Sequence, residues 1–543
     1  MNARHAMVPL HARVETPVAP SRDPRPRQFA LSTSASPVAE NWRCTELDGP
    51  LFLHHHPELP LELFESDRGF FLILGLYFDY AEHLGMPPIA EAATRFADLS
   101  EAIDRVRYLA GRWVVICRYR GETFVFTDAG GLFGVFYASA PGVAVRVSCN
   151  PEVIAECERY RISESAAQFF ARPAYRSCLP IEVPDDPSLQ DDNWWPGTMT
   201  PYHEVKRLLP NHFLDLNHVK TVRYWPAARI AARSLEEGAR QGAQFMRQVV
   251  CGLARKRPIA LPVTAGLDTR LLLAASREVS DRVDYFCYSP DPDQFGASDA
   301  DDANAAASLA QSLGLDIKIF HYDKTVDRDV AEMFLKNASF HTAAMAILQV
   351  SSAFVDHGLQ NRLVLNGNVS EICRNYYGVL PKITSAKVWA HLIGMGDSRL
   401  ATKEVAAWLQ DVRPNWQPGD MELSDLFYWE FRIGGWQSLL QLQMNPFVQM
   451  FTPYNCRHLL ETMLGVELRY RAGPDYPLYK KMIQYLWPEC LSVPINPAGD
   501  RRWRRKVRLG VAQHRYMNLI ARSIDRASRK SGARGGYAAS NRS

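Results

Sequence analysis

Eight consecutive residues, Val263–Arg270, combine side chains that can hold an anion. The hydroxyls of Thr264 and Thr269 flank an Ala-Gly turn, and Asp268 stands at the start of a helix-like run. Small residues let backbone N–H groups approach an anion closely, and a helix N-terminus favours negative charge. A carboxylate at that point repels phosphate unless it holds Mg²⁺. The segment therefore predicts a pyrophosphate-binding loop for ATP, with Asp268 as the magnesium ligand.

The flanking residues supply the elements that must position this loop. The apolar run Pro258–Val263 is typical of a buried strand, and Leu271–Val279 is typical of a helix. An ordinary strand-to-helix turn capped by Asp268 and Thr269 is the alternative interpretation of the same pattern. The nucleotide-binding residues predicted for this turn are Thr264, Ala265, Gly266, Leu267, Asp268, Thr269 and Arg270.

Two roles are open for Arg270, which directly follows the loop. Its planar guanidinium can contact a phosphate or a substrate carboxylate through two parallel hydrogen bonds. It can equally be a solvated side chain in the first turn of the helix.

From about residue 41 to 225 the sequence is rich in short strand patterns separated by turn signals. The segments Phe70–Phe78, Arg112–Tyr119 and Glu122–Thr127 are examples. Sandwiched antiparallel sheets account for this pattern.

From residue 226 to 522 helices alternate with buried strands, which predicts a doubly wound parallel sheet in an overall α/β protein. Ligands of such sheets bind at the carboxyl ends of the strands, where the loop lies. After about residue 420 the chain is expected to be mostly helical. The predicted parallel strands are Ile259–Val263, Val283–Tyr288, Ile317–Tyr322 and Leu363–Asn366.

Composition limits the class of protein. A chain of 543 residues is too long for one core, and a formal charge of +3 gives no general attraction to nucleic acid. The ten cysteines lack metal-ligand or redox spacing, and no long uncharged apolar run is present. We therefore expect a cytoplasmic protein that does not bind membranes. Residues 1–40 are expected to be a disordered leader and residues 523–543 a flexible basic tail.

The loop resembles the Ser-Gly-Gly-X-Asp-Ser signature of the PP-loop ATP pyrophosphatases, in the asparagine synthetase branch. Thr264, Gly266, Asp268 and Thr269 match in kind, whereas Ala265 replaces a glycine. The order of the parts is similar over roughly residues 70 to 490. Further matching segments are Leu74–Asp79, Thr127–Leu132, Leu208–Leu216, Arg223–Trp225, Pro446–Phe447 and Thr452–Tyr454.

This resemblance implies an N-terminal-nucleophile glutaminase-like domain of αββα type at residues 41–225. A PP-loop synthetase domain with ATP and Mg²⁺ as cofactors follows at residues 226–522. A glutaminase of that type needs an N-terminal cysteine, but residue 2 is Asn2 and the first cysteine is Cys44. Leu74 stands where the family has an oxyanion-hole asparagine, and leucine has no donor. We expect the domain to have lost glutamine hydrolysis and to act as a scaffold.

A second motif, Asn366–Ile372, resembles the family's Gly-Glu-Gly-Ala-Asp-Glu-Leu turn. Ser370 replaces an aspartate expected to bind Mg²⁺, whereas Glu371 remains acidic and is predicted to be catalytic together with Asp268. Asn368 offers a neutral oxygen ligand. The segment Pro488–Pro497, which corresponds to the site of the family's catalytic lysine, contains no lysine.

Three other features have ordinary interpretations. The acids Asp299, Asp301 and Asp302 favour a helix N-terminus, with a minor site role as the alternative. Neighbouring residues of the run His54–His56 point to opposite faces of a strand, so the three cannot converge on a metal. The basic run Arg501–Lys506 is favoured as a solvated face or protein contact over a nucleic-acid site.

The leading hypothesis is a ligase that adenylates a carboxylate and transfers the acyl group to ammonia or an amine. The substrates are expected to be small molecules or peptides. Glutamine-dependent asparagine synthesis, a PP-loop enzyme that modifies nucleic acid, and a non-catalytic scaffold remain as alternatives.

Overall fold

The computed structural model describes residues 25–140, 142–170, 194–291, 301–322, 326–337, 344–378, 385–396, 398–414, 416 and 421–495. The chain divides into two compact units between Val493 and Pro494, and the elements below belong to the first. The predicted basic tail and the run Arg501–Lys506 lie outside the described residues. Among the described helices, none is long and apolar enough to cross a bilayer.

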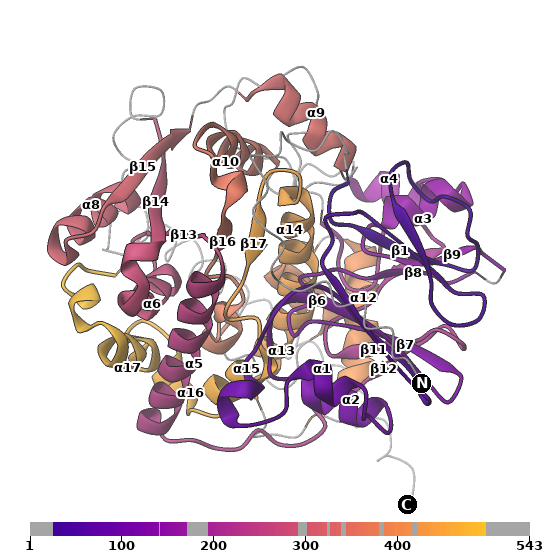
Figure 1. Cartoon of the computed structure of the whole chain (residues 1–543), viewed down its shortest axis with the longest axis horizontal. Helices are drawn as coiled ribbons and strands as arrows, with labels where there is room; N and C mark the ends of the chain where they lie inside the picture. The colour runs from indigo at the N-terminus through magenta and orange to yellow at the C-terminus, as the bar shows by residue number, and fades with distance from the viewer. Residues whose placement is uncertain are drawn as a thin grey trace, which may run out of the picture. The chain divides into compact units, whose positions relative to one another are not determined.

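The first half of the chain forms two antiparallel sheets (Figure 1). The first has the order β10-β8-β9-β1-β3-β2, and the second has the order β12-β11-β7-β6-β5-β4. The strands of the first sheet are β1 (Phe29–Ser32), β2 (Arg43–Glu46), β3 (Phe52–His55), β8 (Phe136–Ala138), β9 (Val145–Ser148) and β10 (Val205–Arg207). Those of the second are β4 (Leu61–Ser66), β5 (Gly69–Asp79), β6 (Leu109–Tyr119), β7 (Glu122–Thr127), β11 (His212–Asp215) and β12 (Lys220–Arg223).

Alternation along the strands explains how these sheets pack. Leu72 and Leu74 of β5 share a buried core with Phe29 and Leu31 of β1, so the two sheets meet through that core. Phe71, on the opposite face of β5, belongs to a second core that covers the outer face. The helices of this half are α1 (Ile89–Ala93), α2 (Leu99–Val106), α3 (Pro151–Glu158) and α4 (Glu164–Phe170). The predicted antiparallel sheets are therefore present, and the N-terminal-nucleophile assignment stays a prediction.

The predicted disordered leader is wrong at its C-terminal end. Strand β1 lies within residues 1–40, yet it pairs with both β3 and β9 and its four residues are buried. The segment is only four residues long and is surrounded by Pro, Arg and Ser, so its composition hid the strand. The domain boundaries at residues 225 and 522 stay predictions.

The second half contains a five-stranded parallel sheet in the order β15-β14-β13-β16-β17. Its strands are β13 (Ile259–Pro262), β14 (Val283–Pro290), β15 (Ile317–Tyr322), β16 (Leu363–Leu365) and β17 (Gln449–Phe451). The four predicted strands are confirmed. The prediction of a mostly helical region after residue 420 is confirmed. The short strand β17 within it was not predicted, because a strand of three residues leaves little periodicity to read.

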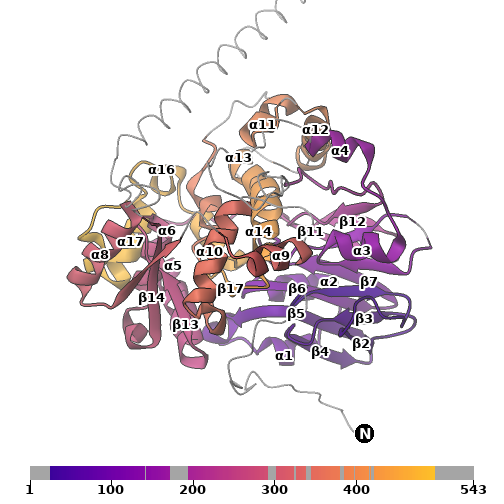
Figure 2. The same ribbon diagram turned by 90° about the horizontal axis from the view of Figure 1, so that it is seen from above.

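Helices cover both faces of this sheet, as the doubly wound prediction requires (Figure 2). One face packs on α9 (Arg328–Asn337), α10 (Ala344–Asp356) and α14 (Ser438–Met444). The helices α5 (Leu235–Lys256), α6 (Leu267–Ala275) and α17 (Pro477–Leu486) contact one another in a second group. The remaining α-helices are α8 (Asp301–Leu313), α11 (Ala386–Leu392), α12 (Arg399–Val412), α13 (Leu423–Phe427), α15 (Arg457–Leu464) and α16 (Leu468–Arg471).

Candidate active site

The two sequence motifs follow neighbouring strands at the point where the strand order reverses. From β13 the chain continues to β14 and β15 on one side, and it later returns to β16 and β17 on the other. The loop 263–266 leaves the carboxyl end of β13, and the turn 366–369 leaves that of β16. Such a reversal opens a crevice in which parallel sheets bind ligands. The topology therefore brings both motifs to the expected place.

The loop itself is built around its two hydroxyls. Thr264 Oγ1 and Thr269 Oγ1 lie 2.7 Å apart, and the Gly266 N–H donates to Thr264 Oγ1 at 3.1 Å. Helix α6 begins at Leu267 with Gly266 as its N-cap and no side-chain cap. The first N–H groups of a helix have no intrahelical acceptor, so this end favours an anion.

A carboxylate of the protein already contacts the loop. The N–H of Ala265 donates to Asp302 Oδ1 at 2.8 Å, from the first turn of α8. In a loop of this kind, such a backbone N–H group donates to a phosphate oxygen. Asp302 Oδ1 therefore takes the place that a phosphate oxygen would have on the Ala265 amide. The minor site role left open for Asp302 in the sequence therefore corresponds to a real contact with the loop.

The second motif lies directly against the loop. A Cβ atom added to Gly367 would lie 2.7 Å from Asp268 Cβ, so only glycine allows this approach. The hydroxyl of Ser370 donates to Asp268 Oδ1. Tyr454, after β17, donates its phenol proton to the Asp268 carbonyl at 3.0 Å, and Tyr479 of α17 donates to the Ser370 carbonyl at 2.7 Å. Two motifs about 100 residues apart thus form one hydrogen-bonded unit.

Arg374 is the cation of the site, and it is not among the residues predicted from the sequence. Arg374 Nη2 lies 2.9 Å from Asp268 Oδ2 and 3.5 Å from Glu371 Oε1. All three side chains are largely buried, with exposures of 15% for Arg374, 18% for Asp268 and 19% for Glu371. The available signal was the spacing of Glu371 and Arg374, which places them three residues apart on the short helix η7 (Ser370–Arg374).

These contacts set the charges of the cluster. Burial, followed by the carboxylate of Asp268, raises the pKa of Glu371 to about 7, although Arg374 opposes the shift. Burial works against the charge of Arg374, but the carboxylates of Asp268 and Glu371 outweigh it and raise the pKa of that guanidinium. The site therefore holds one firm ion pair and one carboxyl group that titrates near neutral pH.

The predicted Mg²⁺ ion does not fit this donor set. Asp268 uses one oxygen to accept from Ser370 and the other to pair with Arg374. Ser370 supplies no carboxylate, and the Asn368 amide is oriented by its donation to Gln437 Oε1 at 2.8 Å. Among the described residues, no group of three or more His, Cys, Asp or Glu side chains is arranged to hold a metal.

The predicted contact of Arg270 with phosphate is wrong for this structure, and so is its alternative as a solvated residue. Arg270 is fully buried, and its Nη1 donates to the carbonyls of Cys490 and Val493 at 2.8 Å each. The side chain thus ties α6 to η9 (Pro488–Leu491) and to the residue two positions after it. Helix phase, which fixes this direction, was the missing information.

The two lysines of α17 are engaged away from the loop. Lys481 pairs with Glu236 at 3.0 Å, and Lys480 lies 3.9 Å from Asp475. The described part of the segment after α17 extends to residue 495 and contains no lysine. No residue of this part of the chain takes the place of the family's lysine.

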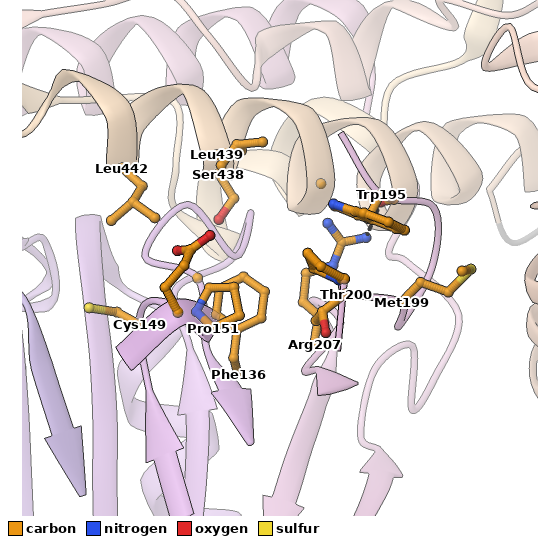
Figure 3. Close-up of a pocket in the computed structure, with 14 residues that line it drawn as sticks. Phe136, Cys149, Pro151, Trp195, Met199, Thr200, Arg207, Ser438, Leu439 and Leu442 are labelled. Atoms are coloured by element: carbon orange, nitrogen blue, oxygen red, sulfur yellow. Dashed lines mark hydrogen bonds between the residues drawn. The ribbon is translucent and has the colours of Figure 1, made fainter. Parts of the chain in front are cut away.

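In the N-terminal half, Leu74 and Cys44 lie on different sheets, and Cys44 Sγ is 4.0 Å from His54 Nε2. Leu74 is fully buried in the core between the sheets, and Cys44 lies on the exposed strand β2. Cys149, Trp195 and Arg207 line a cavity (Figure 3). Its volume of about 30 Å³ has room for a single water molecule. Burial raises the pKa of the Cys149 thiol to about 12, so it stays protonated at neutral pH.

No protein-family model and no curated protein matches this chain. Among solved structures it is similar to an NH3-dependent NAD synthetase from Campylobacter jejuni in complex with nitrate. That match has 15% identity and a TM-score of 0.20, and it covers 36% of this chain and 93% of the other. It is also similar to a glutamine-dependent NAD+ synthetase from Acinetobacter baumannii in complex with ADP. There the identity is 17% and the TM-score 0.20, over 42% of this chain and 41% of the other. At this distance neither structure informs on activity, and the candidate site rests on its own residues.

Proposed function

We propose that the chain binds ATP at the loop Thr264–Thr269 and uses it to join a carboxylate to a nitrogen nucleophile. The main support is that the loop after β13 and the turn after β16 meet where the strand order reverses, joined by the hydrogen bond between Ser370 and Asp268. The segments after β13 and β16 offer two hydroxyls, a helix N-terminus and a guanidinium. Phosphate groups bind to this set of donors.

The reaction has two steps. A substrate carboxylate oxygen attacks the α-phosphorus of ATP and the α–β bridging bond breaks, which gives an acyl adenylate and pyrophosphate. The nitrogen lone pair then attacks the acyl carbon, AMP leaves with the bonding electrons, and the nitrogen loses one proton. The loop residues bind the departing pyrophosphate through the Thr264 and Thr269 hydroxyls and the N–H groups at the start of α6.

Glu371 is suited to accept the proton that the nitrogen loses. A general base is most effective when its pKa lies near the working pH, and the pKa of Glu371 is raised to about 7. Leu74 stands where the resemblance implies an oxyanion-hole asparagine, so we expect no glutamine hydrolysis, and the proposed nitrogen donor is ammonia or an amine of a second substrate. The carboxylate is a small molecule or a peptide.

The test is calorimetric binding of α,β-methylene-ATP, whose α–β bridge cannot be cleaved, to the full chain. Binding by the wild type that is weakened at least about tenfold in Thr264→Val, which removes a loop hydroxyl, supports a live nucleotide site. Thr33→Val, at an exposed position in the N-terminal half, is the matched control and should bind like the wild type. A screen for carboxylates that promote exchange of labelled pyrophosphate into ATP then identifies the acyl substrate.

A non-catalytic scaffold is the second candidate, and a specific observation favours it. Asp268 is fully satisfied by Ser370 and Arg374 without any ligand, and Asp302 already contacts the loop amide. A wild type that binds neither α,β-methylene-ATP nor pyrophosphate at millimolar concentration would establish this candidate and refute the ligase.

A further inference from the structure

Arg374 places a cation beside the carboxylate that the resemblance makes a magnesium ligand. In the expected site, Asp268 and a second aspartate at position 370 share a divalent cation. In this chain residue 370 is serine, and the guanidinium of Arg374 contacts Asp268 Oδ2 at 2.9 Å and Glu371 Oε1 at 3.5 Å. One carboxylate is absent and one cation is present within the same cluster.

The charges of the two arrangements balance in the same way. Glu371 is common to both arrangements and is left out of the sum. Carboxylates at positions 268 and 370 with a divalent cation then sum to zero, and so do the carboxylate of Asp268 and the guanidinium of Arg374. A divalent ion bound to Asp268 would lie at about 2.1 Å from a carboxylate oxygen that already faces the guanidinium. Repulsion between the two cations disfavours such an ion. The serine at position 370 and the arginine at position 374 therefore fit the same arrangement, in which the protein itself neutralises Asp268.

The position of the Arg374 side chain is also held by its neighbours. It ends the single turn Ser370–Arg374, whose carbonyl at Ser370 is anchored by the buried Tyr479. Its guanidinium lies over the ring of Tyr476, 5.8 Å from the centroid. Its Nε is buried and has no hydrogen-bond partner among the described residues, so a donor is left for an anionic oxygen.

We propose that Arg374 supplies the positive charge of this site from within the protein, so that diphosphate oxygens bind the loop without a metal ion held by the chain. The ligand class is an inorganic or nucleoside polyphosphate. The inference rests on the proposed nucleotide site, which it refines by removing the protein-bound metal. Arg374 donates to phosphate oxygens while it keeps Asp268 neutralised, which a fork with several N–H groups allows.

The experiment measures binding of inorganic pyrophosphate and of α,β-methylene-ATP to the full chain by calorimetry, once in EDTA and once in MgCl2. The wild type is expected to bind pyrophosphate in EDTA within about threefold of its affinity in MgCl2. Arg374→Gln is expected to weaken binding in EDTA at least about tenfold, the effect of losing one charge-assisted contact. Arg374→Lys keeps the charge without the fork and should fall between the two. Arg469→Gln removes an exposed arginine and should have no effect.

A double variant gives a readout that a structural role alone does not produce. Ser370→Asp with Arg374→Gly restores the expected carboxylate and removes the guanidinium, and its binding should now require Mg²⁺. If Arg374→Gln does not fold, binding of pyrophosphate by the wild type in EDTA and in MgCl2 still decides whether the site needs a metal ion.

The failures of the two proposals are distinguishable. A wild type that binds α,β-methylene-ATP only in MgCl2 overturns the role of Arg374 and leaves the nucleotide site standing. Unchanged binding by folded Arg374→Gln has the same meaning. A wild type that binds neither compound in either buffer overturns both proposals.

Discussion

The buried carboxylate of Asp128 accepts a hydrogen bond of 2.7 Å from the side-chain amide of Asn455, 327 residues further along the chain. Asp128 also accepts from the backbone N–H groups of Leu132 and Phe133 at 2.9 Å each. Asn455 Oδ1 in turn accepts from the Gly130 N–H at 2.7 Å. Asn455 therefore completes the turn after β7, and its neighbour Tyr454 donates to Asp268 in the loop. This connection ties the N-terminal sheets to the loop through two adjacent residues.

Asn455→Ala is expected to destabilise the protein by about 3 kcal/mol, because it leaves a buried carboxylate and a buried N–H without their partner. Urea unfolding followed by tryptophan fluorescence measures the change. Asn361→Ala, at an exposed position, should change the free energy of unfolding by less than about 0.5 kcal/mol. Equal effects of the two substitutions would show that the connection contributes nothing to stability.

Gly367→Ala is expected to abolish pyrophosphate binding, because the new Cβ meets Asp268 Cβ at 2.7 Å and separates the two motifs. Calorimetry with pyrophosphate, at a temperature where the variant is folded, checks this. Gly252→Ala is the control for general destabilisation, since its Cβ meets the Phe78 ring at 2.4 Å, away from the loop. Retention of full affinity by folded Gly367→Ala would contradict the close approach.

The raised pKa of Glu371 predicts that the free energy of unfolding falls as the pH rises. Its pKa rises from 4.5 to about 7 on folding, mainly because of burial, so the folded state binds the proton more tightly than the unfolded state. The free energy of unfolding should thus be highest at the acid end of this window, fall between about pH 4.5 and 7, and level off above it. The shift corresponds to a loss of about 2–4 kcal/mol.

Glu371→Gln cannot ionise, so this contribution to the pH dependence should vanish. We would measure urea unfolding at pH 5 and pH 7.5 for the wild type, for Glu371→Gln and for the exposed control Glu489→Gln. The comparison isolates the contribution of Glu371 to the pH dependence of the free energy of unfolding. An identical pH dependence in all three proteins would show that Glu371 titrates normally.

Asp302→Ala is expected to raise the affinity for pyrophosphate about tenfold. The substitution frees the Ala265 N–H for a phosphate oxygen and removes a negative charge from the loop. Asp316→Ala makes the same charge change at an exposed position of the chain and should have a smaller effect. Weaker binding by Asp302→Ala would instead place Asp302 among the groups that help to bind the ligand.

The sequence by itself determined the parts whose signals are local. The order of strand, small-residue turn and helix around Gly266 is written in eight adjacent residues, and the structure has β13, the loop and α6 there. Alternating and buried runs likewise fixed four of the five parallel strands. Short strands such as β1 and β17 escaped, because three or four residues carry too little periodicity and their stability comes from pairing with distant strands.

Only the tertiary structure decided which groups meet at the loop. Arg374 reaches Asp268 because β16 returns to the side of β13, a pairing between segments about 100 residues apart that no local pattern encodes. The direction of Arg270 depends on the phase of α6 against the segment after η9. The types of residue could be read from the sequence, but the charge balance around Asp268 arises from long-range packing, and that balance sets what the site can bind.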